Sequence, residues 1–396
     1  MNQCRACCSM QLQEYLNFGY QPLSTVLFDQ PHWNPPRFLM AYDYCSHCGH
    51  VQHRYPIDPS FFYEEYGRMR SKIIPAYVGD LTREIRERVG GTNKLVVEIG
   101  SNDGMFLQEL QKVGFSNVIG IEAAKNCVEA ALQNGVTTLY GYFSFEMADK
   151  VLHTYGKPCA IIIRHVLEHI DHIDAFLSAV LLMMSEQTLL VIEVPDLMWA
   201  IQKGDFTSFT DQHISYFTKN SLTVLLARFG LRIDSISIVP NNWSDALLCF
   251  CYRGEMKLPS QRPLSRESAK SFVESMRETA HGLERLKSRG KMVGFGGFCR
   301  TVNLINYLHL NTQGVFEFIV DDDPQKYHKY LPGSNLVVLS PDEMKRKSIP
   351  FCIICTVNYE AQIIAAHKDY ALARGQFVTL FPFREQSDSS TTMVDC

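Results

Sequence analysis

The ten residues LVVEIGSNDG, from Leu95 to Gly104, constrain the fold of this chain more than any other segment. The apolar run Leu95–Ile99 is typical of a buried parallel strand, and it carries an acid, Glu98, at its end. A tight turn from Gly100 to Gly104 follows, and a helical pattern begins at Met105. Strand, glycine turn and helix in this order predict an α/β domain whose ligand meets bare backbone at the carboxyl end of the strand.

The acids around this turn indicate which kind of ligand it would hold. The turn differs from the dinucleotide fingerprint, which has three glycines and holds a pyrophosphate. Carboxylates at Glu98 and Asp103 would repel phosphate and attract a cationic, hydroxylated ligand such as S-adenosylmethionine. The next strand, Val118–Ile121, ends in Glu122, which can accept hydrogen bonds from a ribose diol. The alternative is an ordinary turn with chance acids, but acids at the ends of two consecutive strands favour the methyl-donor interpretation.

Length and composition limit the class of protein. A chain of 396 residues is too long for one typical domain. The net charge of −4 argues against a general nucleic-acid binder, which usually has a basic face. No stretch approaches the roughly 18 apolar residues of a membrane span, and the first residues do not resemble a signal peptide. We therefore expect a cytoplasmic protein whose thirteen cysteines are thiols and metal ligands.

Composition divides the chain into three segments. Residues 1–65 hold Cys, Pro, Tyr and His with little periodicity, which predicts a small loop-rich module. Residues 66–255 alternate helical patterns with apolar strands, which predicts a parallel sheet built from βαβ units. Residues 256–396 predict a second, smaller α/β domain with a tail, after Glu385, that is expected to be disordered.

The strands expected in the last two segments are short apolar runs. In the central segment they are Leu95–Ile99, Val118–Ile121, Ala160–Ile163 and Leu189–Glu193, followed by an antiparallel pair, Leu231–Val239 and Leu247–Tyr252. In the last segment they are the run beginning at Lys291, Phe316–Val320 and Phe351–Thr356.

Two pairs of cysteines predict a metal site in the first segment. Each pair has the Cys-x-x-Cys spacing, which lets two thiolates face one ion, and four soft ligands suit tetrahedral zinc. A site closed by four protein ligands leaves no position for water, so we expect a structural zinc. Cys8, His47 and His50 are weaker candidates, and the alternative is four free core thiols. The predicted zinc ligands are Cys4, Cys7, Cys45 and Cys48.

Two histidines follow the expected strand Ala160–Ile163. His165 and His169 have a spacing that occurs in metal sites, but the sequence places no third ligand beside them. A loop that lines the donor pocket is the favoured interpretation. The residues predicted to bind the donor are Glu98, Gly100, Asn102, Asp103, Gly104, Glu122 and His165.

A further histidine, His213, is the candidate for a catalytic base. It lies among aromatic residues, after the ligand-binding edge of the expected sheet and before a helix expected at Asn220–Phe229. Its unperturbed pKa, near 6.5, suits proton removal at neutral pH. The alternative is a buried histidine that holds a loop in place.

Together these motifs resemble the sugar C-methyltransferase family over nearly the whole chain. Its members join a zinc-binding module, a class I methyltransferase domain with a Rossmann-like sheet, and a C-terminal Rossmann-like domain. The resemblance implies methylation of a nucleotide-linked keto-deoxysugar, beside the ketone, through an enolate, with the C-terminal domain contributing to acceptor binding. It rests on the four cysteines, Glu98–Gly104, His165–His169, Glu193–Asp196, His213, Ser215–Phe217, Val320–Lys326, Leu331–Gly333 and Asn358–Glu360.

The resemblance implies that His213 is the base and that its neighbours assist it. The family has an acid where this chain has Gln212, and a tyrosine where it has Thr210. An amide cannot stabilise an imidazolium as a carboxylate can, although Asp211 would do so if it reaches. The chain also departs from the family at Tyr66–Ser71 and Asn241–Ser244.

These departures keep two other functions open. One is transfer of the methyl group to an oxygen or nitrogen of another small metabolite, which the changes at Gln212 and Thr210 support. The other is a non-catalytic protein that keeps the donor fold as a scaffold. The intact acids Glu98, Asp103 and Glu122 argue against the scaffold.

Overall fold

The computed structural model describes residues 3–31, 34–63, 74–241, 244–258, 264–310 and 314–385. Tyr66–Ser71, the pair at 242 and 243, and the tail after Glu385 lie outside the described residues. The chain forms two compact units. The first comprises Met1–Asn17, Ala41–Trp199 and Gln212–Arg266, and the second Phe18–Met40, Ala200–Asp211 and Glu267–Cys396.

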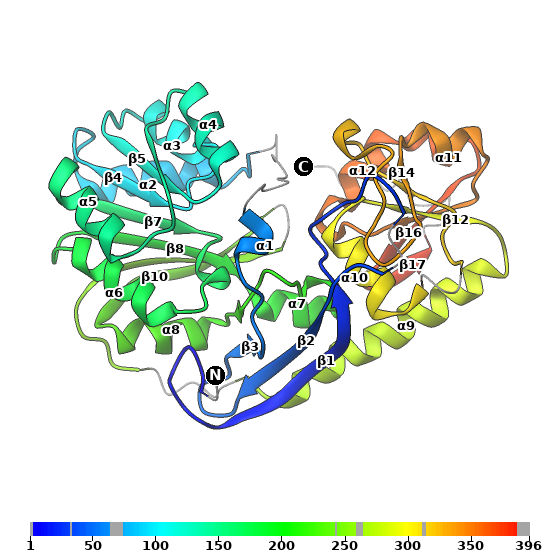
Figure 1. Ribbon diagram of the computed structural model, residues 1–396, viewed down its shortest axis with the longest axis horizontal. Helices are drawn as coiled ribbons and strands as arrows, with labels where there is room; N and C mark the ends of the chain where they lie inside the picture. Colours follow the sequence, from blue (N-terminus) through cyan, green and yellow to red (C-terminus); the bar gives the residue numbers. More distant parts are fainter. Residues whose placement is uncertain are drawn as a thin grey trace, which may run out of the picture. The chain divides into compact units, whose positions relative to one another are not determined.

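The first unit contains a seven-stranded sheet of order β10-β11-β8-β7-β4-β5-β6 (Figure 1). Strands β8, β7, β4, β5 and β6 are parallel, whereas β11 pairs antiparallel with both β8 and β10. This is the strand order of the class I methyltransferase sheet, and it confirms the expected strands and the hairpin. The bounds are β4 Val96–Ile99, β5 Val118–Glu122, β6 Thr138–Tyr140, β7 Ala160–Arg164, β8 Leu189–Pro195, β10 Leu231–Val239 and β11 Ala246–Arg253.

Helices cover both faces of this sheet, which is why its central strands read as continuous apolar runs. In β7, Ile161 and Ile163 pack on one side with α5, α6 and α8, while Ile162 packs on the other with α2 and α3. The helices of this unit are α1 Ser60–Tyr63, α2 Val78–Val89, α3 Met105–Lys112, α4 Lys125–Gln133, α5 Phe145–Tyr155, α6 Ile173–Met183 and α8 Lys219–Arg228.

A second sheet, of order β1-β2-β3-β9, is formed mainly by the N-terminal segment. Its bounds are β1 Leu12–Pro22, β2 Arg37–Cys45, β3 Val51–His53 and β9 Ser215–Tyr216. The expectation of a loop-rich module was wrong here, because β1 alone has 11 residues. The last six residues of β2 are all buried, so the strand lacks the polar–apolar alternation that marks a half-exposed strand.

The second unit contains a six-stranded sheet of order β14-β13-β12-β15-β16-β17. Its bounds are β12 Met292–Phe295, β13 Ile319–Val320, β14 Val338–Leu339, β15 Phe351–Ile354, β16 Gln376–Leu380 and β17 Phe383–Glu385. All pairs but β16–β17 are parallel, as expected for an α/β unit. Its helices are α9 Ala269–Lys287, α10 Cys299–Tyr307, α11 Asp342–Arg346, α12 Glu360–Ala366 and α13 Lys368–Leu372, and α7 Leu197–Lys203 joins the two units in sequence.

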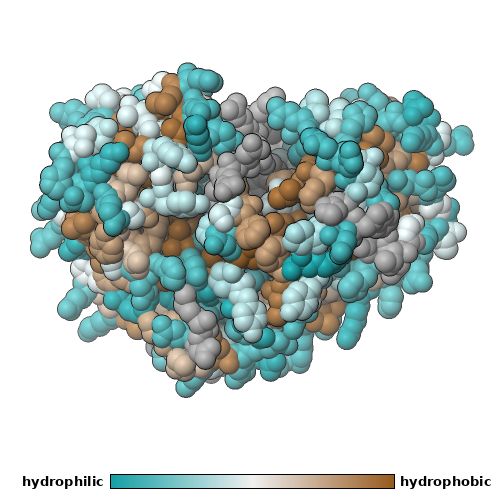
Figure 2. Space-filling model, viewed as in Figure 1, coloured by the Kyte–Doolittle hydropathy of each residue, from teal (hydrophilic) through white to brown (hydrophobic). Residues whose placement is uncertain are grey.

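On the face shown in Figure 2, hydrophilic residues are interspersed with smaller hydrophobic patches. Among the residues described, we find no helix with the length and apolar character that a membrane span needs. The cytoplasmic location stays a prediction.

Candidate active site

The four predicted zinc ligands come together in the first unit. The Sγ atoms of Cys4 and Cys48 lie 3.6 Å apart, as do those of Cys7 and Cys45, and all four lie within 4.8 Å of one another. Zinc–sulfur bonds of about 2.3 Å in a tetrahedron place the sulfurs about 3.8 Å apart, so the cluster fits zinc without rearrangement.

The knuckle that carries Cys45 and Cys48 is shaped by a glycine. Gly49 has φ +75°, and its N–H donates to the Cys45 carbonyl at 2.8 Å. A Cβ at Gly49 would lie 2.6 Å from the Leu264 nitrogen, so both the turn and the packing require glycine here.

The predicted donor-binding turn lies where the sheet order reverses. Strand β4 has β5 on one side and β7 on the other, and such switch points bind ligands in α/β sheets. Gly100 has φ +72°, and a Cβ there would lie 2.3 Å from Cγ2 of Val166. Glycine at this position is therefore required by the fold itself, in addition to any approach of a ligand. Gly104, with φ +78°, begins α3.

Glu122 organises the turn through its carboxylate. Oε2 accepts a hydrogen bond from the Asn102 N–H at 2.9 Å, and Oε1 accepts one from the Ala124 N–H at 2.8 Å. Asn102 has φ +56°, and its side-chain oxygen accepts from the Asp103 N–H at 2.7 Å. Asn102, Asp103 and Glu122 thus form one hydrogen-bonded unit at the ends of β4 and β5.

Glu98 lies in β4 and is 3% exposed. Burial raises its pKa to about 8, with Glu122, Glu193 and Asp103 acting in the same direction and Arg164 against it. Its Oε2 is buried and has no hydrogen-bond partner. An unpartnered buried carboxyl oxygen fits a ligand that brings a cationic or hydroxyl donor, as S-adenosylmethionine does.

Replacing Glu122 by alanine is expected to weaken binding of S-adenosylmethionine at least about tenfold. The change removes the charged acceptor expected for the ribose hydroxyls, and each such hydrogen bond contributes roughly 1.5–3 kcal/mol. Calorimetric titration measures the dissociation constant, and Glu129→Ala, which removes an exposed carboxylate from α4, is the matched control. An unchanged dissociation constant for Glu122→Ala would place the donor elsewhere.

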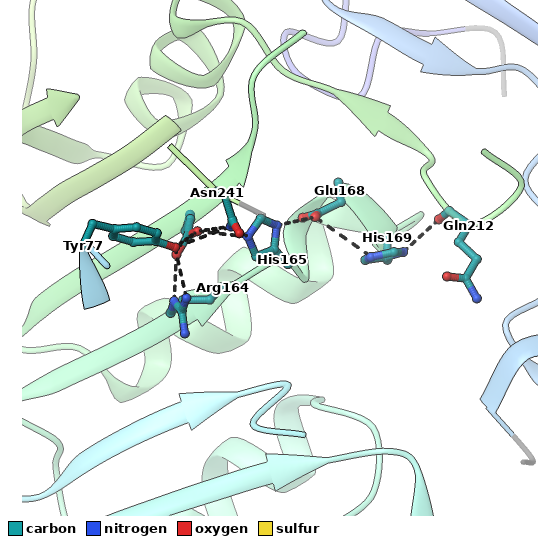
Figure 3. A network of polar contacts seen from close by, with 8 residues as sticks. Tyr77, Arg164, His165, Glu168, His169, Gln212 and Asn241 are labelled. Atoms are coloured by element: carbon teal, nitrogen blue, oxygen red, sulfur yellow. Dashed lines mark hydrogen bonds and ion pairs between the residues drawn. The ribbon is translucent and has the colours of Figure 1, made fainter. Parts of the chain in front are cut away.

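A polar network surrounds Glu193, which lies in β8 and is fully buried. Figure 3 labels its partners Tyr77, Arg164, His165 and Asn241. Its carboxylate accepts hydrogen bonds from Arg164 Nε at 2.7 Å, from Asn241 Nδ2 at 2.9 Å and from the Tyr77 hydroxyl, and it pairs with His165 Nε2 at 2.9 Å. Burial alone would raise the pKa of Glu193, but Arg164 and His165 hold it well below its usual range. Asn241, one of the departures from the family, is therefore part of this network.

His165, predicted to bind the donor, is a fixed cation of this network. Burial alone would lower its pKa, but Glu193 and Glu168 together raise it to about 10. His165 therefore carries a positive charge at neutral pH and cannot accept a proton there.

His213 lies beside a second histidine and a carboxylate. Its ring centre is 4.8 Å from that of His169, in an edge-to-face arrangement, and ligand atoms of Glu168, His169 and His213 lie within 4.8 Å of one another. Burial, together with His169 and His165, lowers the pKa of His213 to about 3 against the effect of Glu168. His213 is thus neutral at physiological pH, but a pKa this low makes it a weak base unless a neighbouring negative charge stabilises its protonated form.

The two residues before His213 have separate partners. Asp211 belongs to the second unit, where its carboxylate accepts hydrogen bonds from the Ser24 N–H at 2.6 Å and the Ser24 hydroxyl at 2.8 Å. The Gln212 carbonyl accepts a hydrogen bond from His169 Nδ1 at 3.0 Å. Sequence reasoning missed Glu168, since no local pattern places it beside His213.

Three family models match the chain in succession. A putative zinc-binding domain matches residues 4–63, a methyltransferase domain residues 69–236, and a C-methyltransferase C-terminal domain residues 264–382. The methyltransferase-domain match and the sheet order together make the chain an S-adenosylmethionine-dependent methyltransferase. The three matches together span most of the chain, which is therefore similar to C-methyltransferases that join these three domains, and its cofactors are S-adenosylmethionine and zinc.

The chain is also similar to individual proteins. The C-methyltransferase NovU of Streptomyces niveus is 24% identical over 409 residues, which span 96% of each chain. Among solved structures, magnesium protoporphyrin IX methyltransferase of Synechocystis PCC 6803 matches 45% of this chain and 82% of its own, with 15% identity and a TM-score of 0.36. A methyltransferase of Archaeoglobus fulgidus matches 44% and 94%, with 14% identity and a TM-score of 0.35.

Proposed function

We propose that this enzyme methylates the carbon beside the ketone of a nucleotide-linked keto-deoxysugar. The observation that carries the proposal is the position of His213 beside His169 and Glu168, because a carbon acid must lose a proton to a nearby base before it can accept a methyl group. The match to NovU, a C-methyltransferase, and to the C-methyltransferase C-terminal domain supports carbon as the acceptor atom.

In the proposed reaction His213 takes the proton from the carbon beside the ketone, and an enolate forms. S-adenosylmethionine, when bound, supplies a sulfonium methyl group, which the enolate carbon takes as the carbon–sulfur bond breaks. The ketone forms again, and His213 releases its proton to solvent. Proton removal by a positioned base contributes about 10²- to 10⁴-fold to such a rate.

The proposal also assigns the donor site, the zinc site and the three domains. Glu98, Gly100, Asn102, Asp103, Gly104, Glu122 and His165 form the donor site, and Cys4, Cys7, Cys45 and Cys48 hold the zinc. Residues 1–65 are the zinc-binding module, 66–255 the methyltransferase domain and 256–396 the acceptor-binding domain. The partner is a small molecule rather than a nucleic acid or a membrane.

Transfer to an oxygen or nitrogen is the second candidate function. It is favoured by one observation, that Gln212 places an uncharged amide next to the base. Such a reaction does not pass through a carbon acid, so it predicts no exchange of a carbon-bound proton with solvent.

The test is to incubate the enzyme with labelled S-adenosylmethionine and a panel of nucleotide-linked 4-keto-sugars, and to locate the methyl group by NMR. The same sugars with the ketone reduced to a hydroxyl are the matched control and should remain unmethylated. A methyl group on oxygen or nitrogen would support the second candidate. No transfer, together with weak donor binding by calorimetry, would indicate a non-catalytic protein.

A further inference from the structure

Glu168 is a buried carboxylate whose nearest charged neighbour is the cationic His165. It lies in η1, Leu167–His169, the short turn after β7, and is 1% exposed. Neither of its carboxylate oxygens has a hydrogen-bond partner. Burying a carboxylate without hydrogen bonds is unfavourable, so such a group in a folded protein calls for a functional reason.

Three histidines face this carboxylate. His165 Nδ1 lies 3.4 Å and His169 Nε2 4.0 Å from Oε1 of Glu168, and His213 approaches from the loop before β9. Although burial opposes ionisation, the close polar contact and positive charge of His165 lower the pKa of Glu168, so it is charged at neutral pH. His165 is a cation, whereas the pKa values of His169 and His213 lie below the usual range and leave both rings neutral.

The orientation of His169 follows from its hydrogen bond. A carbonyl oxygen only accepts, so His169 Nδ1 must donate its proton to the Gln212 carbonyl. In the neutral ring of His169, Nε2 then carries a lone pair. Both Nε2 of His169 and the Glu168 carboxylate are therefore hydrogen-bond acceptors. A proton held on His213 would supply the positive charge that this group of acceptors lacks.

The charges around the site balance only if Glu168 is ionised. Arg164 and His165 are the cations, and Glu193 and Glu168 are the anions. A proton on His213 adds a third positive charge. If Glu168 were uncharged, Glu193 would be left as the anion beside the cations Arg164 and His165. Adding a proton to His213 would then be much less favourable.

We propose that Glu168 is a positioning residue that stabilises the protonated form of His213 during the reaction. The inference rests on the proposed function of His213 as the base. The proton moves from the substrate carbon to His213 and then to solvent, while Glu168 keeps its negative charge throughout. Gln212, adjacent to His213 in sequence, is uncharged and cannot supply this stabilisation.

A divalent metal ion bound by Glu168, His169 and His213 is the rival interpretation, because these residue types ligate such ions. The cationic His165, 3.4 Å from the carboxylate, disfavours a second cation at this place. The arrangement therefore favours a proton over a metal ion.

The test compares Glu168→Gln, which removes the charge and keeps the shape, with Glu168→Asp, which keeps the charge. Glu186→Gln, which changes an exposed carboxylate before β8, is the control. The readouts are deuterium exchange at the carbon beside the ketone without methyl donor, kcat, KM and melting temperature. The substrate is the nucleotide-linked 4-keto-sugar of the panel that wild type turns over.

We expect Glu168→Gln to lower exchange and kcat at least about tenfold. KM and donor affinity should change little, and the melting temperature should hold or rise, because burying an amide is less unfavourable than burying a charge. Glu168→Asp should restore part of the rate. If Glu168 had a purely structural role, Glu168→Gln would change the melting temperature. The rates of Glu168→Gln and Glu168→Asp would then not differ according to the charge that each variant keeps or loses.

Three results would overturn the inference. The first is exchange by Glu168→Gln at the wild-type rate. The second is one metal equivalent per chain, beyond the cysteine-bound zinc, that Glu168→Gln loses. The third is absence of exchange by wild type on every sugar of the panel, which overturns the proposed function itself and this inference with it.

Discussion

Replacing His213 by alanine should lower turnover by about 10²- to 10⁴-fold while leaving the affinity for S-adenosylmethionine unchanged. The reason is that the neutral imidazole is the proposed acceptor of the proton from the substrate carbon. The measurement is steady-state turnover on the accepted keto-sugar, combined with calorimetric titration of the methyl donor.

Deuterium exchange gives an independent check on this prediction. In heavy water without methyl donor, wild type should incorporate deuterium at the carbon beside the ketone, and His213→Ala should not. His153→Ala, which removes an exposed histidine from α5, is the control and should exchange normally. Near wild-type turnover by His213→Ala would show that the base is another group and would strengthen the heteroatom alternative.

Loss of the zinc should have the largest effect on stability. The double variant Cys45→Ser, Cys48→Ser removes two of four ligands, and structural zinc sites bind with roughly 10–16 kcal/mol of apparent free energy. We expect wild type to carry about one zinc per chain and the variant to lose it. Elemental analysis measures the metal, and limited proteolysis of the N-terminal segment measures the loss of folding.

The same variant should also reduce turnover, because the metal cluster is connected to the site by backbone. Cys45 ends β2, and β3 pairs Val51 with Tyr216 of β9, directly after the loop that carries His213. The His53 N–H also donates to the Ile214 carbonyl at 2.8 Å. Cys8→Ser is the matched control, since Cys8 is exposed and lies outside the cluster. Zinc loss in Cys8→Ser, or full zinc content in the double variant, would contradict the ligand assignment.

The central sheet could be predicted from local pattern. Its parallel strands are buried on both faces, so each one appears as a short apolar run, and Leu95–Gly104 adds the turn that marks the ligand-binding edge. The N-terminal strands could not be predicted in this way, because the buried half of β2 has no regular alternation of polar and apolar residues.

The residues of the candidate site also fall into those that a local sequence pattern predicts and those that it does not. The paired cysteines have a spacing that itself indicates a metal, and the acids Glu98 and Glu122 indicate a donor because they lie at the ends of consecutive strands. Only part of the reason for glycine at position 100 could be read from the sequence. The other part is the close contact with Val166, which joins the ends of β4 and β7 and is set by the fold.

The sequence by itself predicted three successive segments, a methyl-donor turn and two cysteine pairs for a metal, because each prediction depends on residue patterns that are local in the chain. Only the tertiary structure decided that Glu168 faces His213, that Glu193 holds His165 as a cation, and that Asp211 binds Ser24. These contacts join residues from separate strands and loops. Their distances and burial, which set the charge states of the site, follow from the packing of the whole fold.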